Sequence, residues 1–455
     1  MPQAFDYDVA IIGAGPAGLF VAERLAGAGL SVAIYEQMPS PARKLLMAGR
    51  GGLNLTHSEP LGRFLKRYHP AEPRLLDAIS AFPPESLVAW AEGLGIATFK
   101  GSSGRIFPRA MKASPLVRAW LQRLGSLGAR LHLRHRMIEI AATWDQTVDA
   151  DSPGITMRFE HVGNPGSAIQ AGQPGSSLQN GVITTVRARA VVLALGGASW
   201  PKLGSDGTWA PQLTNKGVSI TPIAPANAGL RVSWSDHFVQ RHAGQPLKRI
   251  VLTIAGHHFP GELIITRNGL EGGPAYAANR LVREALAATH GASPVVAALD
   301  LRPDLDTQTL AARLSTPRGK QSFANHLRKR GGLTALTASL LREGSHVETA
   351  GKDATVADRS PVNPSALPAM VLAERIKSLP IEVHGLCGLE RAISTAGGIA
   401  ADALDDNFML KDLPGVFAAG EMLDWEAPTG GYLLQATFAT ASAAADGVRR
   451  TLDAA

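Results

Sequence analysis

The sequence contains very little cysteine and few aromatic residues. Cys387 is the single cysteine, and aromatic residues make up 5% of the 455 residues. One cysteine excludes an internal disulfide and a Cys-x-x-Cys redox motif, so the chain cannot perform intramolecular dithiol–disulfide exchange. We expect Cys387 to be buried and to behave as a small hydrophobic side chain rather than a reactive thiol.

Long apolar runs are also missing. No stretch reaches the roughly 18 apolar residues that a membrane span requires. Asp6 and Asp8 precede the first apolar run, which is typical of a strand and not of a signal peptide. We therefore expect a cytoplasmic protein that does not span a membrane. The length favours two or three structural units rather than one.

Positive charge is in moderate excess, with 45 Lys and Arg against 38 Asp and Glu and a net charge of +7. Such an excess can serve a nucleic acid, a membrane surface or an anionic cofactor. The arginines are scattered and the densest cluster, 328–330, is short, so we expect solvated surface rather than a nucleic-acid patch. The 13 histidines show no metal-ligand spacing: His257 and His258 are neighbours on an expected strand and point to opposite faces.

The N-terminal residues have the pattern of a dinucleotide-binding unit. An apolar segment at 7–12 leads into a glycine-rich turn and a helical pattern at 16–28, and a second apolar segment at 31–35 ends at Glu36. Strand–helix–strand order predicts parallel strands. Gly13 would permit the tight turn, Gly15 would let a pyrophosphate approach the backbone, and Gly18 would let helix and strand pack closely.

Two further features of this unit define the ligand. The amides at the helix N-terminus would hold a diphosphate through their partial positive charge. Glu36 would accept hydrogen bonds from the adenosine ribose hydroxyls and would repel a 2′-phosphate, which argues against NADP at this place. Spacing alone does not separate FAD from NAD.

Later segments favour FAD. Residues 413–421 form an apolar strand pattern ending in Gly420 and Glu421, which resembles the second fingerprint of the glutathione-reductase-like FAD superfamily. The acid of that fingerprint holds the ribityl chain, and it is usually Asp rather than Glu. Residues 190–197 resemble a further glycine motif of the superfamily, in which a strand passes the cofactor.

Several motifs narrow the resemblance to one family. They are Arg43-Lys44-Leu45-Leu46 with Gly49 to His57, Gly104 to Pro108, Gly420 to Asp424, Gly430 to Gln435, and Gly261 to Leu263 with Gly273-Pro274. Together they resemble the aminoacetone oxidase-like (BaiN-like) family of FAD-binding enzymes over essentially the whole chain. The glycine loop departs from the family's usual Gly-Gly-Gly-Arg-Cys-Asn, because Leu53 replaces the cysteine and the arginine falls at Arg50.

The resemblance implies an α/β fold: a Rossmann-type FAD-binding domain (three-layer ββα) with an inserted small β-barrel and a helical subdomain. We expect the FAD domain at 1–215 and 381–455, the barrel at 216–270 and 346–380, and the helices at 271–345. The patterns predict the following elements: a polar loop at 39–59; helices at 71–94, 112–127, 274–289 and 305–345; strands at 131–141, 155–161, 182–187, 190–195, 249–254, 262–266 and 381–385; and an irregular excursion at 142–181.

The predicted FAD contacts come from four parts of the chain. They are Gly13, Ala14, Gly15, Pro16, Ala17, Gly18, Glu36 and Gln37; Arg43, Lys44, Gly49, Arg50, Gly51 and Asn54; Met137, Ile138, Ala194, Gly196 and Gly197; and Gly420, Glu421, Gly430, Gly431, Tyr432 and Leu433.

Some of these residues carry specific expectations. Lys44 or Arg50 would place a positive charge near the flavin N1–C2 edge, and the helix after Gly431 would aim its N-terminus at the same edge. Tyr432 would either border the substrate pocket or serve only in packing. His57 could be a base, a substrate ligand, a flavin attachment point or merely polar. We therefore assign no catalytic residue and no metal ligand.

Three functions remain open. The first is an FAD-dependent oxidoreductase that oxidises a small amine or ketone-bearing substrate with oxygen as acceptor, because the sequence contains one strand-linked Gly-x-Gly-x-x-Gly and no second fingerprint for NAD(P)H. The second is an NAD(P)H-dependent flavin reductase acting on an enone-type small molecule. The third is a basic flavoprotein that acts on RNA, or a flavin-binding interaction protein. The sequence predicts no oligomeric state.

Overall fold

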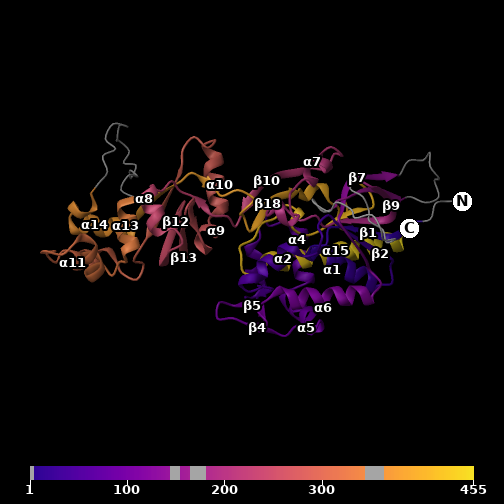
Figure 1. Cartoon of the computed structure of the whole chain (residues 1–455), viewed down its shortest axis with the longest axis horizontal. Helices are drawn as coiled ribbons and strands as arrows, with labels where there is room; N and C mark the ends of the chain where they lie inside the picture. Colours follow the sequence, from indigo (N-terminus) through magenta and orange to yellow (C-terminus); the bar gives the residue numbers. More distant parts are fainter. Residues whose placement is uncertain (1–4, 144–153, 164–180, 344–362, 455) are drawn as a thin grey trace, which may run out of the picture. The chain divides into compact units, whose positions relative to one another are not determined.

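The computed structural model describes residues 5–143, 154–163, 181–343 and 363–454. These residues form two compact units: Met1–Ala224 with Ser394–Ala455, and Pro225–Ile393 (Figure 1). Both units carry sheets and helices. The three-part division with a separate helical subdomain remains a prediction. The excursion expected at 142–181 lies largely outside the described residues.

A parallel sheet lies at the centre of the first unit. Four of its strands, β6, β2, β1 and β9, are parallel neighbours in that order, and β19 also pairs in parallel with β9. Their bounds are β1 (Tyr7–Ile12), β2 (Val32–Glu36), β6 (Arg130–Leu133), β9 (Ile183–Leu193) and β19 (Val416–Ala418). In β1 the exposure falls to zero at Val9, Ala10 and Ile11, as expected of a strand covered on both faces.

Strand β9 belongs to two layers. Its first half pairs antiparallel with β8 (Gly154–His161), which pairs with β7 (His135–Thr143), and its second half pairs with β1. The two strands predicted at 182–187 and 190–195 are therefore one strand; that prediction was wrong because Arg187 and Arg189 keep the period-2 alternation across the assumed break. The α/β Rossmann-type fold class is confirmed.

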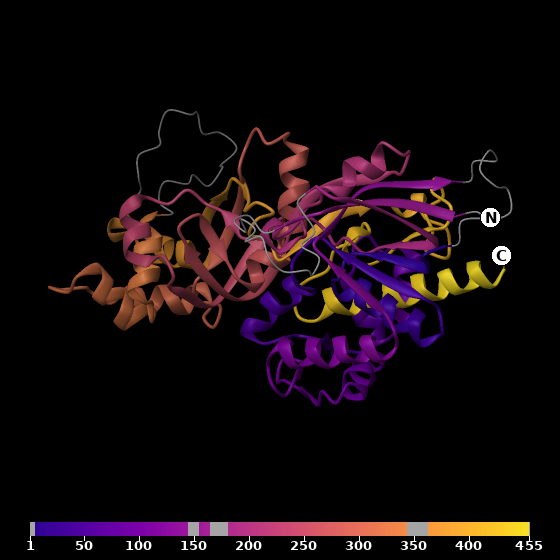
Figure 2. The ribbon, with the colours of Figure 1, turned by 45° about the vertical axis from the view of Figure 1, so that its right-hand side comes forward.

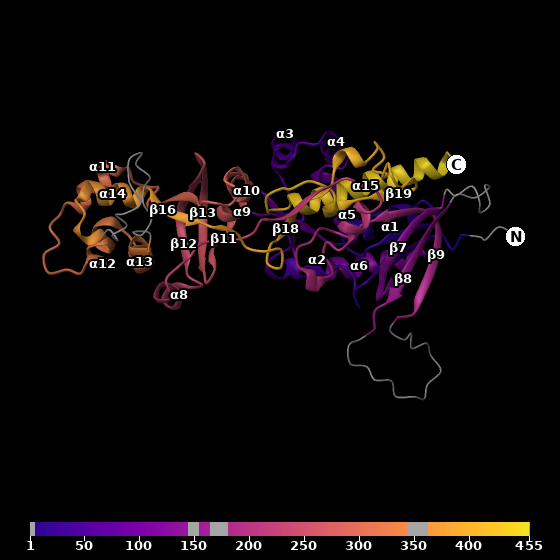
Figure 3. The ribbon, with the colours of Figure 1, turned by 90° about the horizontal axis from the view of Figure 1, so that it is seen from above.

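Helices cover this sheet. Those that bear on the site are α1 (Pro16–Gly27), α2 (Arg43–Ala48), α4 (Pro73–Ala81), α5 (Pro84–Gly93), α6 (Ala113–Ser126) and α15 (Tyr432–Asp453). α1 packs along α15, as Figure 3 also shows. Phe20 of α1 and Phe438 of α15 meet edge to face at 4.9 Å, and Trp90 lies 4.7 Å from Phe438. These aromatic contacts join the N-terminal helix to the C-terminal one.

Two small sheets complete the first unit. One has the order β3 (Thr56–His57), β5 (Arg105–Pro108), β4 (Thr98–Lys100), and the other pairs β10 (Ile220–Ala226) with β18 (Ser394–Ile399). The polar loop predicted at 39–59 was wrong in part, because it contains α2, a 3-10 turn at Gly49–Gly51 and β3. Ala42, with φ +54°, reverses the chain direction just before α2.

The second unit holds an antiparallel sheet with the order β16, β15, β12, β13, β14, β11, β17 across the residues that are described. Its strands are β11 (Leu230–Arg231), β12 (Pro246–Ile254), β13 (His257–Thr266), β14 (Gly269–Glu271), β15 (Val295–Asp300), β16 (Leu379–Val383) and β17 (Gly385–Leu386). The patterns missed β15. The strand predicted at 381–385 is β16, and it pairs with β15 inside this unit.

Helices pack on that sheet (Figure 2). The helix predicted at 274–289 is divided at Ala278 into α9 (Gly273–Ala277) and α10 (Asn279–Ala288). The helix predicted at 305–345 is α11 (Thr307–Leu314), α12 (Phe323–His326) with a π-turn at Leu327–Gly331, and α13 (Ala335–Glu343). Cys387 is buried, as predicted. Among the described residues no helix combines the length and the apolarity needed to cross a bilayer.

Candidate active site

The turn after β1 has the geometry that a dinucleotide requires. Gly13, at φ +104°, and Gly18 pack so closely that an added Cβ would overlap the carbonyl oxygens of Ala194 and Gly13, respectively. At Gly15 the opposite holds: φ is −78°, and no atom lies within 4 Å of an added Cβ. The close contacts at Gly13 and Gly18 hold strand and helix together, while Gly15 leaves open backbone for a ligand.

The N-terminus of α1 lacks a side-chain cap, and Pro16 is its first residue. The first-turn amides of this helix thus have no capping side chain to satisfy them, which suits an anion. Glu36 lies beside the turn: its Oε2 accepts a hydrogen bond from the Ala14 amide, and its Oε1 accepts one from the Met38 amide, each at 2.8 Å. Burial raises the pKa of Glu36, while these two hydrogen bonds act to lower it.

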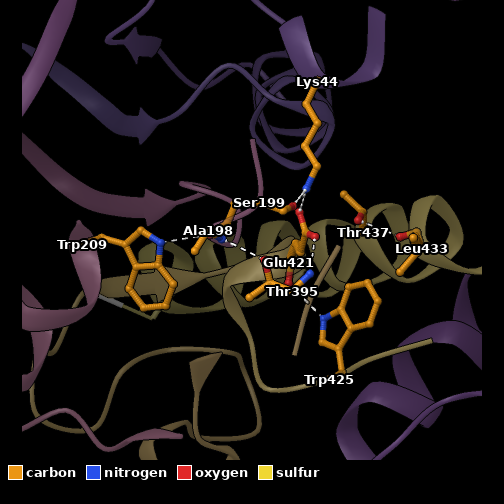
Figure 4. A network of polar contacts seen from close by, with 11 residues as sticks. Lys44, Ala198, Ser199, Trp209, Thr395, Glu421, Trp425, Leu433 and Thr437 are labelled. Atoms are coloured by element: carbon orange, nitrogen blue, oxygen red, sulfur yellow. Dashed lines mark hydrogen bonds and ion pairs between the residues drawn. The ribbon is translucent and has the colours of Figure 1, made fainter. Parts of the chain in front are cut away.

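A polar network joins three distant segments (Figure 4). Lys44 Nζ on α2 donates to Ser199 Oγ and to Glu421 Oε2, each at 2.6 Å. Glu421 Oε1 accepts from the Thr395 amide at 3.1 Å. The side chains of Lys44 and Glu421 are 27% and 16% exposed, so water screens this ion pair only partly.

The glycines around this network are fixed by hydrogen bonds from large side chains. Trp209 Nε1 donates to the Gly196 carbonyl and Trp425 Nε1 to the Gly420 carbonyl, each at 3.0 Å (Figure 4). A Cβ on Gly197 would overlap the hydroxyl of Thr395. The predicted residues Ala194, Gly196, Gly197, Gly420 and Glu421 therefore do come together with Lys44 at the carboxyl ends of β9 and β19.

The loop after α2 offers an unsatisfied acceptor. Asn54 Oδ1 is buried and has no hydrogen-bond partner in the described structure. A buried oxygen of this kind is costly unless a ligand supplies a donor. Gly49 lies so close to Ala113 that a Cβ would not fit, whereas Gly51 is open and Arg50 is exposed. Of the two predicted cations, Lys44 points into the site and Arg50 does not have a fixed partner there.

The turn before α15 is held by an aromatic cluster. Gly430 and Gly431 adopt φ of +120° and +107°, which glycine tolerates, and a Cβ on Gly431 would overlap the Thr56 backbone. Tyr432 is 5% exposed, and its hydroxyl donates to Glu59 Oε1 at 2.5 Å. Burial and the Glu59 carboxylate raise the pKa of Tyr432. Tyr432 therefore packs and anchors the turn rather than presenting its hydroxyl to a substrate.

His57 has both ring nitrogens engaged. The Glu59 amide donates to Nδ1 at 3.0 Å, and Nε2 lies 2.9 Å from the Ser103 carbonyl, to which it must donate. This arrangement places a ring proton on Nε2 and leaves Nδ1 as the acceptor. The ring stacks on Tyr432 at 5.4 Å. Of the roles left open for His57, the structure favours the merely polar one.

The remaining predicted FAD contacts are residues that follow β2 and residues of β7. Gln37 Nε2 donates to the Gly204 carbonyl at 2.9 Å, and Arg43 donates to Ser40 Oγ at 3.2 Å. On β7, the register with β8 shifts between Met137 and Glu139, so Ile138 is the unpaired residue of a bulge. Its backbone is free of the ladder, as contact with an adenine would require.

Sequence reasoning missed Ser199, Thr395 and Glu59. Ser199 follows the Gly196-Gly197 pair with Ala198 between them, and Thr395 precedes a second glycine pair in the fully buried strand β18. A polar residue close to paired glycines was the signal that could have found both. Glu59 had no comparable signal, because its partners Arg67 and Tyr432 are remote or unpatterned in the sequence.

Comparison with known proteins agrees with this geometry. The chain matches the family described as "HI0933-like protein Rossmann domain" over residues 7–162 and 165–447. It is 24% identical to a 3-dehydro-bile acid delta(4,6)-reductase of Clostridium scindens, over 95% of this chain and 96% of that protein. It is also 24% identical to a ribosomal RNA dihydrouridine synthase of Escherichia coli, over 96% and 97%.

Among solved structures, a 3-ketosteroid delta1-dehydrogenase of Sterolibacterium denitrificans shares the fold, with a TM-score of 0.50, 13% identity and coverage of 98% of this chain and 99% of that one. The family match and the geometry confirm the cofactor prediction: this is an FAD-dependent oxidoreductase. The open backbone at Gly15, the uncapped α1 and the unpaired Asn54 oxygen fit that cofactor.

Proposed function

The chain belongs to the HI0933-like FAD-binding Rossmann family, and from that premise we propose that it is a reductase of carbon–carbon double bonds conjugated with a carbonyl group. One observation carries the proposal. Two relatives aligned over nearly their full length are named for reductions of this one kind. A 3-oxo group activates the 4,6 double bonds of the first substrate, and the C4 carbonyl activates the C5–C6 bond of uridine in the second.

The proposed electron donor is freely diffusing NADH or NADPH. In the part of the chain that is described, one parallel dinucleotide-binding turn is present, and the sheet of the second unit is antiparallel. A nicotinamide donor would therefore bind transiently at the flavin rather than in a resident domain. When bound, FAD can accept a hydride from such a donor and transfer it to the β-carbon of the activated double bond.

The protein residues would supply binding and electrostatics. Asn54 Oδ1 would accept a hydrogen bond from a donor group of the flavin, and the N-terminus of α15 would stabilise negative charge on its pyrimidine edge. Lys44 would hold Glu421 in place for the ribityl hydroxyls. His57 and Tyr432 each have their polar atoms engaged, so neither is assigned as the proton donor to the α-carbon.

Anaerobic stopped-flow mixing of the holoprotein with NADH and with NADPH tests the proposal. We expect one of the two donors to cause a rapid loss of the absorbance of oxidised flavin at roughly 450 nm. Adding a cyclic enone should then reoxidise the flavin and restore this absorbance. If neither donor reduces the flavin, while a small amine or amino ketone does and oxygen then reoxidises it, the oxidase hypothesis replaces the reductase.

A further inference from the structure

The small sheet β3–β5–β4 carries aromatic and cationic side chains on one face. Arg105 and Phe107 are two residues apart on β5, so they share a face. His57 is the cross-strand partner of Arg105, and Phe99 is the partner of Phe107. The rings of Phe99 and Phe107 stack at 5.6 Å with an interplanar angle of 24°. We name these residues, with Arg109, the β5 face.

Arg109 extends this pattern beyond the end of β5. Its amide donates to the Ala97 carbonyl at 2.9 Å, so the ladder continues past Pro108. The alternation on one side of the strand is therefore Arg105, Phe107, Arg109: an aromatic ring between two cations. Phe99 is 38% exposed although its ring stacks on the half-buried ring of Phe107.

The β5 face adjoins both glycine turns of the flavin site. Arg105 Nε lies 3.2 Å from where a Cβ on Gly430 would be, and Phe107 Cε1 lies 3.7 Å from the corresponding position on Gly52. His57 stacks on Tyr432, the first residue of α15. A molecule lying on this face would thus reach both glycine turns, beside which the flavin is expected.

Charge on and around the β5 face has one sign. Residues 98–118 contain five Lys or Arg and no Asp or Glu. Arg50, Arg105, Arg109 and Lys112 are all exposed. Arg105, Arg109 and Lys112 are close in the sequence, whereas Arg50 comes from a separate segment. A cationic surface of this kind attracts a polyanion.

We propose that the β5 face holds a single-stranded RNA segment, with bases stacked on Phe99 and Phe107 and phosphates paired with Arg105 and Arg109. Exposed rings alternating with arginines are the arrangement by which proteins hold unpaired strands. A membrane would require a broad apolar surface rather than two rings, and an acidic peptide would not use the exposed ring faces. That an unsaturated base of the strand is then the hydride acceptor rests on the proposed reductase function.

Fluorescence anisotropy of a labelled ten-nucleotide oligouridine with the FAD-loaded protein tests the proposal. We expect Phe99→Ala to weaken binding about tenfold, the magnitude found when one base loses its stacking partner. Arg109→Ala should weaken binding and reduce the slope of log K against log salt by about 0.7, as removal of one phosphate contact does. Lys100→Ala is the matched control: Lys100 pairs with Ile106, so it lies on the opposite side of the same sheet.

The outcomes separate the possibilities. Equal binding by the parent protein, Phe99→Ala and Arg109→Ala overturns the proposal, and so does an equal loss in Lys100→Ala. Binding to vesicles of anionic lipid without binding to oligouridine also overturns it. The flavin spectrum of each variant shows that the site is intact. RNA binding is measured without an electron donor, so the two proposals can fail separately. If the protein does not bind RNA but NAD(P)H reduces its flavin, only the RNA-binding proposal is overturned. If the protein binds RNA but NAD(P)H does not reduce its flavin, only the reductase proposal is overturned.

Discussion

Replacing Lys44 by Met should destabilise the first unit of the apoprotein. The substitution keeps most of the side-chain volume but removes the donors to Ser199 Oγ and Glu421 Oε2, both at 2.6 Å. Hydrogen bonds to charged groups contribute about 1.5–3 kcal/mol each. Glu421 would keep one partner, the Thr395 amide, in surroundings that leave it 16% exposed.

The net loss is smaller than the sum of the two contacts. Freeing the lysine side chain from one rotamer returns up to about 2 kcal/mol, and residual exposure screens the pair. We therefore expect a loss of about 2–3 kcal/mol. For a unit of this size, each kcal/mol lowers the melting temperature by roughly 2–4 °C. Calorimetry of the apoprotein should then show a fall of roughly 5–10 °C in one of its transitions.

A double-mutant cycle identifies the cause. Glu421→Gln removes the charge that Lys44 pairs with. The loss of unfolding free energy in the double variant should therefore be smaller than the sum of the two single losses, by about 1–2 kcal/mol. Strict additivity would mean that the 2.6 Å contact makes no energetic contribution. An unchanged melting temperature for Lys44→Met would refute the reasoning altogether.

Three further predictions concern the same unit. Gly15→Ala should weaken FAD binding at least tenfold, measured by flavin fluorescence, because the added Cβ would occupy the space expected for the pyrophosphate. It should not lower apoprotein stability, because no protein atom lies within 4 Å of that Cβ. Gly27→Ala, where the surroundings are equally open, should leave the affinity for FAD unchanged. The raised pKa of Glu36 means that it becomes protonated at a higher pH than an ordinary glutamate, and a protonated carboxyl group is a weaker acceptor for the ribose hydroxyls. As the pH falls, FAD release should therefore begin at a higher pH than with an ordinary glutamate. The apoprotein gains stability from this group as the pH falls through that pKa, so circular dichroism should show no unfolding at release, and Glu36→Gln should abolish the pH dependence. Tyr432→Phe should lower the free energy of unfolding by about 1–2 kcal/mol in urea titrations; an unchanged midpoint would mean that the bond to Glu59 is energetically neutral.

The sequence predicted the parts of the site that depend on local chemistry. Gly13, Gly15 and Gly18 each have a role set by a few neighbouring residues, and the structure places them as the pattern requires. Strand β1 was visible because continuous apolar burial produces a continuous apolar run. A helix or strand could be predicted wherever the pattern of apolar residues in the sequence matched the pattern of burial along that single element.

The rest depends on contacts between remote segments. Nothing in the sequence near Lys44 indicates that it pairs with Glu421, which is reached only through the sheet order. The helices α9 and α10 were merged because no proline or polar cluster marks the change of direction at Ala278. Likewise, His57 and Phe99 join Arg105 and Phe107 on one face only because β5 lies between β3 and β4.

The packing of α1 against α15 has a consequence for biosynthesis. The first strand and helix are made early, but Glu421, Tyr432 and α15 emerge from the ribosome only after the whole of Pro225–Ile393. That segment is continuous in sequence and has its own core, so it can fold while the N-terminal half still lacks its partner helix. FAD would then be captured late, and a nascent chain stalled before Ser394 would expose the apolar side of α1 to chaperones.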